Sequence, residues 1–252
     1  MAGGRRYNAG MLSPPLKALR LAGHILAGLL LVLLRFPSLD QAERTRRVTR
    51  WAGQLLAILA VRVTTRGEPP PPGGALVAAN HVSWLDIHLL HSLLPARFIS
   101  KAEVRNWPIF GRFAEASGTV FLEREKKADA MRVNQLMAAH LRDGDCLALF
   151  PEGTTTDGTK LLPFFPSLFQ PAVEARATVW PVCIRYLNRD GTICIDAAYC
   201  DQISLGASLL KILKLRELRA EVRFLPAIAG LSRRELARAA EDAVRRALST
   251  TA

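Results

Sequence analysis

Residues 75–86 read ALVAANHVSWLD, and this stretch decides the fold class of the chain. Its first five residues are small and aliphatic, which is typical of a short buried strand. A polar turn follows at once, and the apolar spacing beyond it predicts a helix over residues 86–94. A strand, a turn and a helix in direct succession form the unit from which α/β sheets are built.

His81 and Asp86 lie five positions apart within this unit. Five residues of one ideal helix rotate through about 140°, so the two side chains meet only if His81 lies in the turn and Asp86 in the helix's first turn. Asp86 would then orient the imidazole, and the other ring nitrogen would take a proton from a substrate hydroxyl. The bare spacing also fits ordinary polar residues of a loop and a helix cap.

A second polar loop strengthens the catalytic interpretation. Residues 150–158 read FPEGTTTDG and follow an apolar strand predicted over 146–150. Ligands of open α/β sheets bind where the strands end. We therefore expect this loop and the loop that carries His81 to open at the same edge of one sheet.

Beyond residue 67, short apolar runs alternate with helical ones, which favours an α/β domain whose sheet is flanked by helices. Strands are predicted at residues 75–79, 97–100, 119–122, 146–150, 178–187 and 221–225. Helices are predicted at residues 86–94, 126–142 and 233–248. Ser232 and Glu235 form a capping box at the start of the last helix.

The first 66 residues are predicted to form a helical hairpin. The apolar run 21–34 would span roughly 21 Å as a helix, short of a hydrocarbon core of roughly 30 Å. We interpret it as a retained membrane anchor, with a buried core helix as the alternative. A second helix is predicted from Arg44 to Val63, capped by Ser38 or Asp40. The proline and glycine run 69–74 separates this hairpin (1–66) from an α/β domain (67–252).

The net charge of +12 and the pI near 10.3 call for an anionic partner. Arginines flank the apolar segment, which favours a membrane surface over nucleic acid. Aromatic residues make up only 7% of the chain, few for a single-strand binder. A cluster of Phe164, Phe165 and Phe169 fits either an acyl-chain pocket or the core. The four cysteines form no C-x-x-C pair, in keeping with a reducing cytoplasm.

Together the two polar loops resemble those of the lysophospholipid acyltransferase family, typified by 1-acylglycerol-3-phosphate acyltransferases. The family's first motif, N-H-x4-D, matches Asn80, His81 and Asp86. Its third motif, F-P-E-G-T, matches residues 150–154 without a gap.

Two weaker motifs of the family also match, in the right order. The second, G-x-x-F-x-x-R, matches Gly118, Phe121 and Arg124, and the fourth, a proline within an apolar strand, matches Pro181. The resemblance covers roughly residues 67 to 190, by motifs and not by alignment.

The resemblance implies a direct transfer without a covalent acyl-enzyme. His81 would deprotonate the acceptor hydroxyl, which attacks an acyl thioester carried by coenzyme A or acyl carrier protein. The donor is thus a substrate, and neither a cofactor nor a metal is implied. The acceptor would come from membrane lipids at the cytoplasmic face of the cell membrane.

The resemblance also assigns substrate-binding positions. Arg124 would hold the acceptor phosphate, Glu152 would position a glycerol-like backbone and Gly153 would permit a tight turn. Asn80, Thr154 and Pro181 complete the set. The plain alternatives are that Arg124 pairs with a neighbouring glutamate and that Glu152 caps a helix.

Thr155 departs from the family pattern, because many glycerol-phosphate acyltransferases have arginine after F-P-E-G-T. Lysophosphatidic acid, giving phosphatidic acid, is the expected acceptor. The missing charge admits lyso-ornithine lipid or lysophosphatidylcholine as alternatives.

Two rival interpretations remain. A metal site built from His81, Asp86, His88 and His91 lacks a distant ligand, so His88 and His91 are interpreted as helix-surface residues. A non-catalytic, basic, membrane-peripheral protein would explain the charge but not the two loops.

Overall fold

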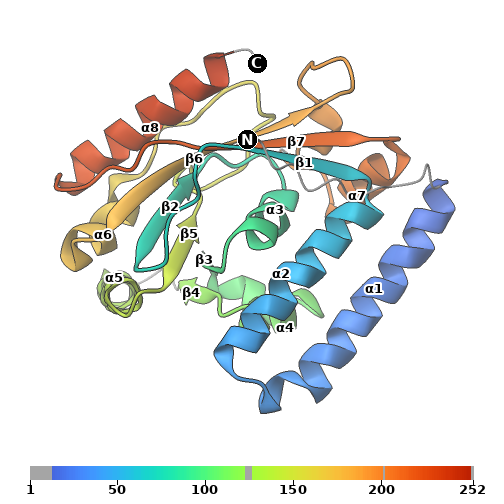
Figure 1. Ribbon diagram of the computed structural model, residues 1–252, viewed down its shortest axis with the longest axis horizontal. Helices are drawn as coiled ribbons and strands as arrows, with labels where there is room; N and C mark the ends of the chain where they lie inside the picture. The colour runs from blue at the N-terminus through green and yellow to red at the C-terminus, as the bar shows by residue number, and fades with distance from the viewer. Residues whose placement is uncertain (1–12, 123–126, 201, 251–252) are drawn as a thin grey trace.

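The computed structural model describes residues 13–122, 127–200 and 202–250. They form one seven-stranded sheet in the order β1-β7-β6-β2-β5-β3-β4, and every neighbouring pair is parallel except β6 and β7. The strands are β1 (Val61–Arg66), β2 (Ala75–Ala79), β3 (Ala96–Lys101), β4 (Val120–Leu122), β5 (Cys146–Leu149), β6 (Thr178–Leu187) and β7 (Leu218–Phe224). The predicted α/β class is confirmed (Figure 1).

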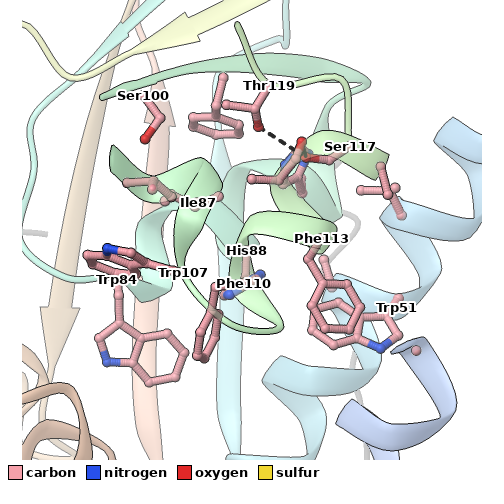
Figure 2. Close-up of a pocket in the computed structure, with 18 of the residues that line it drawn as sticks. Trp51, Trp84, Ile87, His88, Ser100, Trp107, Phe110, Phe113, Ser117 and Thr119 are labelled. Atoms are coloured by element: carbon pink, nitrogen blue, oxygen red, sulfur yellow. Dashed lines mark hydrogen bonds between the residues drawn. The ribbon is translucent and has the colours of Figure 1, made fainter. Parts of the chain in front are cut away.

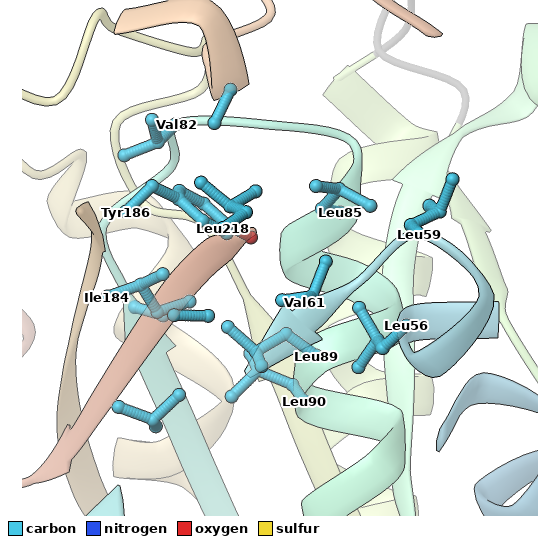
Figure 3. Packing of buried hydrophobic residues seen from close by; sticks show 14 of the residues in the cluster. Leu56, Leu59, Val61, Val82, Leu85, Leu89, Leu90, Ile184, Tyr186 and Leu218 are labelled. Carbon is cyan, nitrogen blue, oxygen red and sulfur yellow. The ribbon is translucent and has the colours of Figure 1, made fainter. Parts of the chain in front are cut away.

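Helices cover both faces of the sheet. They are α1 (Pro14–Leu34), α2 (Gln41–Ile58), α3 (Leu85–Leu93), α4 (Phe110–Ala116), α5 (Lys127–Arg142), α6 (Gln170–Ala175), α7 (Leu205–Lys214) and α8 (Arg233–Ser249). Helices α2, α3 and α7 bury their apolar residues in the core on one face, and α5, α6 and α8 do so on the other. Figure 3 shows the first core, where leucines of α2 and α3 meet residues of β1, β6 and β7.

Strand β2 lies at the centre of the sheet, and all five of its residues are buried. Val77 and Ala79 face the α3 side, whereas Leu76 and Ala78 face the α5 and α8 side. A strand covered on both faces reads as a continuous apolar run, which is why the sequence located it to the residue. The chain leaves β2 at Asn80, so the polar turn begins at the edge of the sheet.

The second predicted helix ends earlier than expected. Asp40 caps it through a 2.7 Å bond from the amide of Glu43, but it stops at Ile58, and Ala60 adopts a left-handed backbone with φ of 59°. The residues predicted to continue the helix to Val63 instead begin β1, which pairs with β7. The helical hairpin is therefore α1 and α2, and residues 61–66 belong to the sheet.

Helix α1 is longer than the predicted apolar run, and its face toward the protein is mixed, because Leu21 and Ile25 also pack against the core. Polar side chains face the protein: the Lys17 ammonium donates to the carbonyl of Leu215 at 2.6 Å, and His24 and Trp51 exchange ring-to-carbonyl bonds. The outward stripe is apolar and exposed, and consists of Leu16, Leu19, Leu26, Leu30, Leu33 and Leu34. Of the helices in the described ranges, α1 is the one long and apolar enough to cross a membrane, judged by length and composition.

Candidate active site

His81 and Asp86 meet as their spacing required. His81 lies in the turn after β2, Asp86 lies in the first turn of α3, and the distance from His81 Nδ1 to Asp86 Oδ2 is 2.7 Å. An ionised carboxylate only accepts, so Nδ1 carries the proton and Nε2 is left as the basic nitrogen. The pair thus has the geometry expected of a general base and its orienting group.

The carboxylate of Asp86 is fully buried and held by further donors. Its Oδ2 accepts from the main-chain amides of Val82 at 2.7 Å and Ser83 at 2.9 Å, and its Oδ1 accepts from the Tyr186 hydroxyl at 2.7 Å. Burial raises the pKa of the Tyr186 hydroxyl well above its ordinary value, and the charge of Asp86 adds to this. Tyr186 therefore remains a donor and fixes the far side of the carboxylate.

Sequence reasoning missed Tyr186. The sequence feature that could have identified it is the Tyr186 hydroxyl within the apolar run 178–187, at a position that is buried in the structure.

The F-P-E-G-T loop clamps the main chain of His81 on both sides. The amide of His81 donates to Glu152 Oε1 at 2.7 Å, and the carbonyl of His81 accepts from the amide of Thr156 at 2.9 Å. Glu152 Oε2 accepts from the amide of Leu162 at 2.8 Å. Burial raises the pKa of Glu152, while these amide bonds oppose the rise. Glu152 thus ties two loops together, and its contact with an acceptor stays a prediction.

The predicted tight turn at Gly153 is present. Its φ of 71° is left-handed, and a Cβ there would lie 2.9 Å from the ring of Phe165. The left-handed backbone favours glycine, and the exposed ring of Phe165 would have to shift to admit a side chain. The next residue, Thr154, is exposed on the loop.

Asn80 lies directly after β2 and Pro181 lies within β6, and both are buried. The amide of Asn80 joins the end of β2 to β6 through two bonds to the main chain of Ile184, at 3.0 and 2.7 Å. Pro181 is buried in β6 opposite Ala78 and does not line the cavity described below. Its carbonyl accepts from the amide of Leu225, just beyond the β6–β7 pairing, where a missing amide is tolerated. Arg124 lies outside the described residues.

An apolar cavity of about 280 Å³ extends from His81 to the α1–α2 hairpin. Its lining comes from α1, α2, α3, β3, the segment before α4, and α4 itself. Figure 2 shows Trp51 and Phe113 on one side, with Trp84, Trp107 and Phe110 on the other. The ring of His81 stacks on Phe150 with centroids 3.8 Å apart, which holds the imidazole at the rim of this cavity.

The interpretation of His88 and His91 as helix-surface residues was wrong. Both line the cavity, because α2 and the segment before α4 cover that side of α3. Burial lowers the pKa of His88 to about 4, with a smaller effect of His24, and lowers the pKa of His91 to about 3. Both are neutral at pH 7. Among the described residues, no group of three metal-ligating side chains is placed to hold an ion.

The three phenylalanines after the loop do not form a pocket for an acyl chain. Phe164 and Phe169 pack in the core between the sheet and α8, and Phe165 is exposed. None of them lines the cavity. The core alternative was therefore correct for two of the three.

A second histidine and aspartate with the same spacing lie elsewhere. His140 Nδ1 is 2.8 Å from Asp145 Oδ2, and Arg97 also pairs with that carboxylate at 2.9 Å. Asp145 directly precedes β5, so this pair lies at the opposite edge of the sheet. Neither residue lines the apolar cavity. Spacing alone therefore does not define the site.

A histidine held by a buried carboxylate at the rim of an apolar cavity is the arrangement expected of an enzyme that applies a general base to a partly apolar substrate. A family model described as Acyltransferase matches residues 60–185, half of the chain. The chain belongs to the acyltransferase family, and the protein is an O-acyltransferase.

Its relatives agree with this assignment. The chain is 41% identical to a lyso-ornithine lipid O-acyltransferase of Pseudomonas aeruginosa, over 94% of each chain. It is 37% identical to a 1-acyl-sn-glycerol-3-phosphate acyltransferase of Neisseria meningitidis, over 73% of this chain and 72% of the relative. The crystal structure of the 1-acyl-sn-glycerophosphate acyltransferase of Thermotoga maritima has the same fold, with a TM-score of 0.67 at 20% identity, covering 93% of this chain and 96% of that one.

Tyr186→Phe is expected to lower kcat about tenfold while KM changes little. Removing the hydroxyl leaves a buried carboxylate oxygen without its donor, a defect that costs about 1–3 kcal/mol. The control is Ile184→Val on the same strand, which lowers stability without touching Asp86. Steady-state kinetics and urea denaturation of both variants would separate an effect on catalysis from an effect on stability. Equal kcat values for the two variants would show that Tyr186 acts only in folding.

Acid is expected to destabilise the protein between pH 6.5 and about 4. The pKa of His91 and that of His88 are lower in the folded protein than in the unfolded chain, so the unfolded chain binds more protons in this window. The free energy of unfolding should fall by up to about 1.4 kcal/mol per pH unit for each histidine. Urea denaturation across this range measures the slope, and His91→Phe should flatten it. An unchanged slope in that variant would refute the explanation.

Proposed function

We propose that the protein transfers a fatty acyl group from a thioester to the hydroxyl of a lysolipid. The observation that carries this proposal is the basic Nε2 of His81 at the rim of an apolar cavity. The acceptor oxygen attacks the thioester carbonyl while its proton passes to Nε2. The carbon–sulfur bond then breaks, and the departing thiolate takes up the proton. Coenzyme A or acyl carrier protein would carry the acyl group, and no cofactor is needed.

The cavity suits the hydrocarbon part of a lipid. Trp51, Phe98 and Phe113 contribute large apolar surfaces, and His88 and His91 are neutral there. An acyl chain in this space would be removed from water, while the reacting carbonyl lies near His81. Water excluded by the chain is also kept from hydrolysing the thioester.

Lyso-ornithine lipid is our proposed acceptor. Support comes first from the Pseudomonas relative, which is similar over nearly its whole length. Second, the position that carries arginine in many glycerol-phosphate enzymes is Thr155, whose hydroxyl donates to the carbonyl of Tyr199. Third, Arg47 is the one lysine or arginine among the described cavity-lining residues, and it pairs with Glu43 at 2.8 Å. An ornithine head group has no phosphate for a cation to bind.

Lysophosphatidic acid is the second candidate, and it was the acceptor expected from the sequence. The Neisseria relative is named for 1-acylglycerol 3-phosphate, and Arg124 matches a motif position that would bind phosphate.

Membrane association is the third part of the proposal. The outward leucines of α1 would lie in the lipid, while Lys17 and His24 face the protein beside the core residue Leu21. The net charge of +12 would add attraction to anionic lipid. The cytoplasmic face is proposed because it offers the thioester donor.

His81→Ala is expected to reduce acyl transfer by roughly 10² to 10⁴, the usual contribution of a general base. Purified protein in mixed micelles would receive labelled acyl-coenzyme A or acyl carrier protein and a panel of lysolipids that includes lyso-ornithine lipid and lysophosphatidic acid. The matched control is His140→Ala, which removes a histidine of the same spacing at the other edge. Higher kcat/KM with lysophosphatidic acid would overturn the acceptor, and full activity of His81→Ala would overturn the mechanism.

Replacing the outward leucines is expected to weaken membrane binding. Leu26→Ser with Leu30→Ser removes two exposed side chains that pack on nothing in the protein's core. Sedimentation with phosphatidylglycerol vesicles should fall about tenfold or more. Deleting all residues before Pro69 is a poorer test, because it also removes β1. Unchanged sedimentation would count against an anchoring role of α1.

A further inference from the structure

The segment before α4 exposes three large apolar side chains within four residues. Trp107 is 48% exposed, Ile109 is 40% exposed and Phe110 is 42% exposed. They follow the short 3-10 helix Ala102–Asn106 and precede the body of α4. We name residues 107–110 the aromatic lip. Single exposed apolar residues are common, but three together mark an interaction surface.

The backbone of the aromatic lip is strained at Ile109. Ile109 has φ of 66° and ψ of −58°, and the amide of Phe110 donates to the carbonyl of Pro108 at 2.7 Å. This is a γ-turn of the rare, strained hand, and a β-branched residue is a poor choice for it. The amide of Gly111 bonds to the carbonyl of Trp107 at 2.9 Å, which holds the turn closed. Strain retained in this manner is typical of functional segments.

The aromatic lip borders the cavity. Trp107 and Phe110 both line it (Figure 2), and both are about half exposed, so the cavity wall at these two residues is also part of the protein surface. Leu31 and Val32 of α1 line the same cavity from the hairpin. Helices α1 and α4 are in contact. The mouth of the cavity therefore has one rim from α1 and another from the aromatic lip.

The chemistry of the surroundings identifies the partner as a lipid bilayer. The outward leucines of α1 continue the apolar surface on one side of the mouth. Arg35 directly follows α1 and Arg112 lies in the first turn of α4; both are exposed and would meet lipid phosphates. Trp is favoured at the boundary between head groups and acyl chains, because its ring is amphipathic.

We propose that the aromatic lip is a second membrane contact, inserted into the same leaflet as α1, and that the cavity opens sideways into the lipid between the two rims. A lysolipid or acyl chain would then enter the cavity from the bilayer without crossing water. This inference rests on the proposed function for the identity of the cargo. The membrane contact itself does not depend on catalysis.

The first test is fluorescence quenching of the full-length protein on vesicles of phosphatidylethanolamine and phosphatidylglycerol that carry brominated acyl chains. Trp107 is one of four tryptophans, and Trp107→Phe removes its signal alone. Brominated lipid should quench the wild type clearly more than Trp107→Phe. Equal quenched fractions in the two proteins would overturn the proposal.

The second test replaces Ile109, which does not line the cavity. Ile109→Asn removes the apolar side chain, and asparagine tolerates positive φ better than isoleucine, so the thermal unfolding midpoint should not fall. The vesicle partition coefficient should drop about tenfold. The matched control is Leu231→Asn, which is 38% exposed just before α8, and it should not change partitioning.

Equal partitioning of the two asparagine variants would overturn the proposal. Acyl transfer by the wild type is measured separately in mixed micelles. Quenching of Trp107 without acyl transfer to any lysolipid would leave the membrane contact standing and would refute the proposed function.

Discussion

The buried carboxylate of Asp86 is the constraint on which the site depends. A charge with no access to water must have its lone pairs matched by donors, and these come from His81, from the amides of Val82 and Ser83, and from Tyr186. The amides fix the turn after β2. Tyr186 requires that β6 lie beside that turn, which the parallel pairing of β2 and β6 provides. One side chain thus couples the orientation of the base to the order of the strands.

The neighbouring strand β5 supplies the other half of the support. Strands β2 and β5 are parallel and in register from Ala75 and Cys146, so their last residues end side by side. The loop after β5 can therefore hold the amide and carbonyl of His81 through Glu152 and Thr156. The same edge of the sheet faces the cavity that runs to α1 and α2. His81, the loop that holds its main chain and the apolar cavity all lie at one edge of the sheet, where parallel strands end.

The sequence predictions succeeded where a feature depends on residues close together in the chain, and failed where it depends on distant ones. Strands β2 and β6 were placed to the residue, the cap at Ser232 was found, and Asp40 was one of two candidate caps, because burial on both faces and capping leave local patterns. The first residues of β1, up to Val63, were read as helix, since they continue the helical spacing before them and only pairing with β7 makes them a strand. The burial of His88 was missed because α2 decides which side of α3 is covered.

By itself the sequence determined the α/β class, the family and the residues expected to form the general base. Each of these depends on short stretches in which residues close along the chain are also close in space. Spacing and residue types do not separate His81 and Asp86 from His140 and Asp145, whereas the predicted strand before His81 and the N-H-x4-D motif do. The tertiary structure added the apolar cavity against which the first pair lies and placed the second pair at the far edge of the sheet. It also decided the role of Tyr186, a hundred residues from Asp86, since a buried hydroxyl finds its partner through strand order and not through sequence.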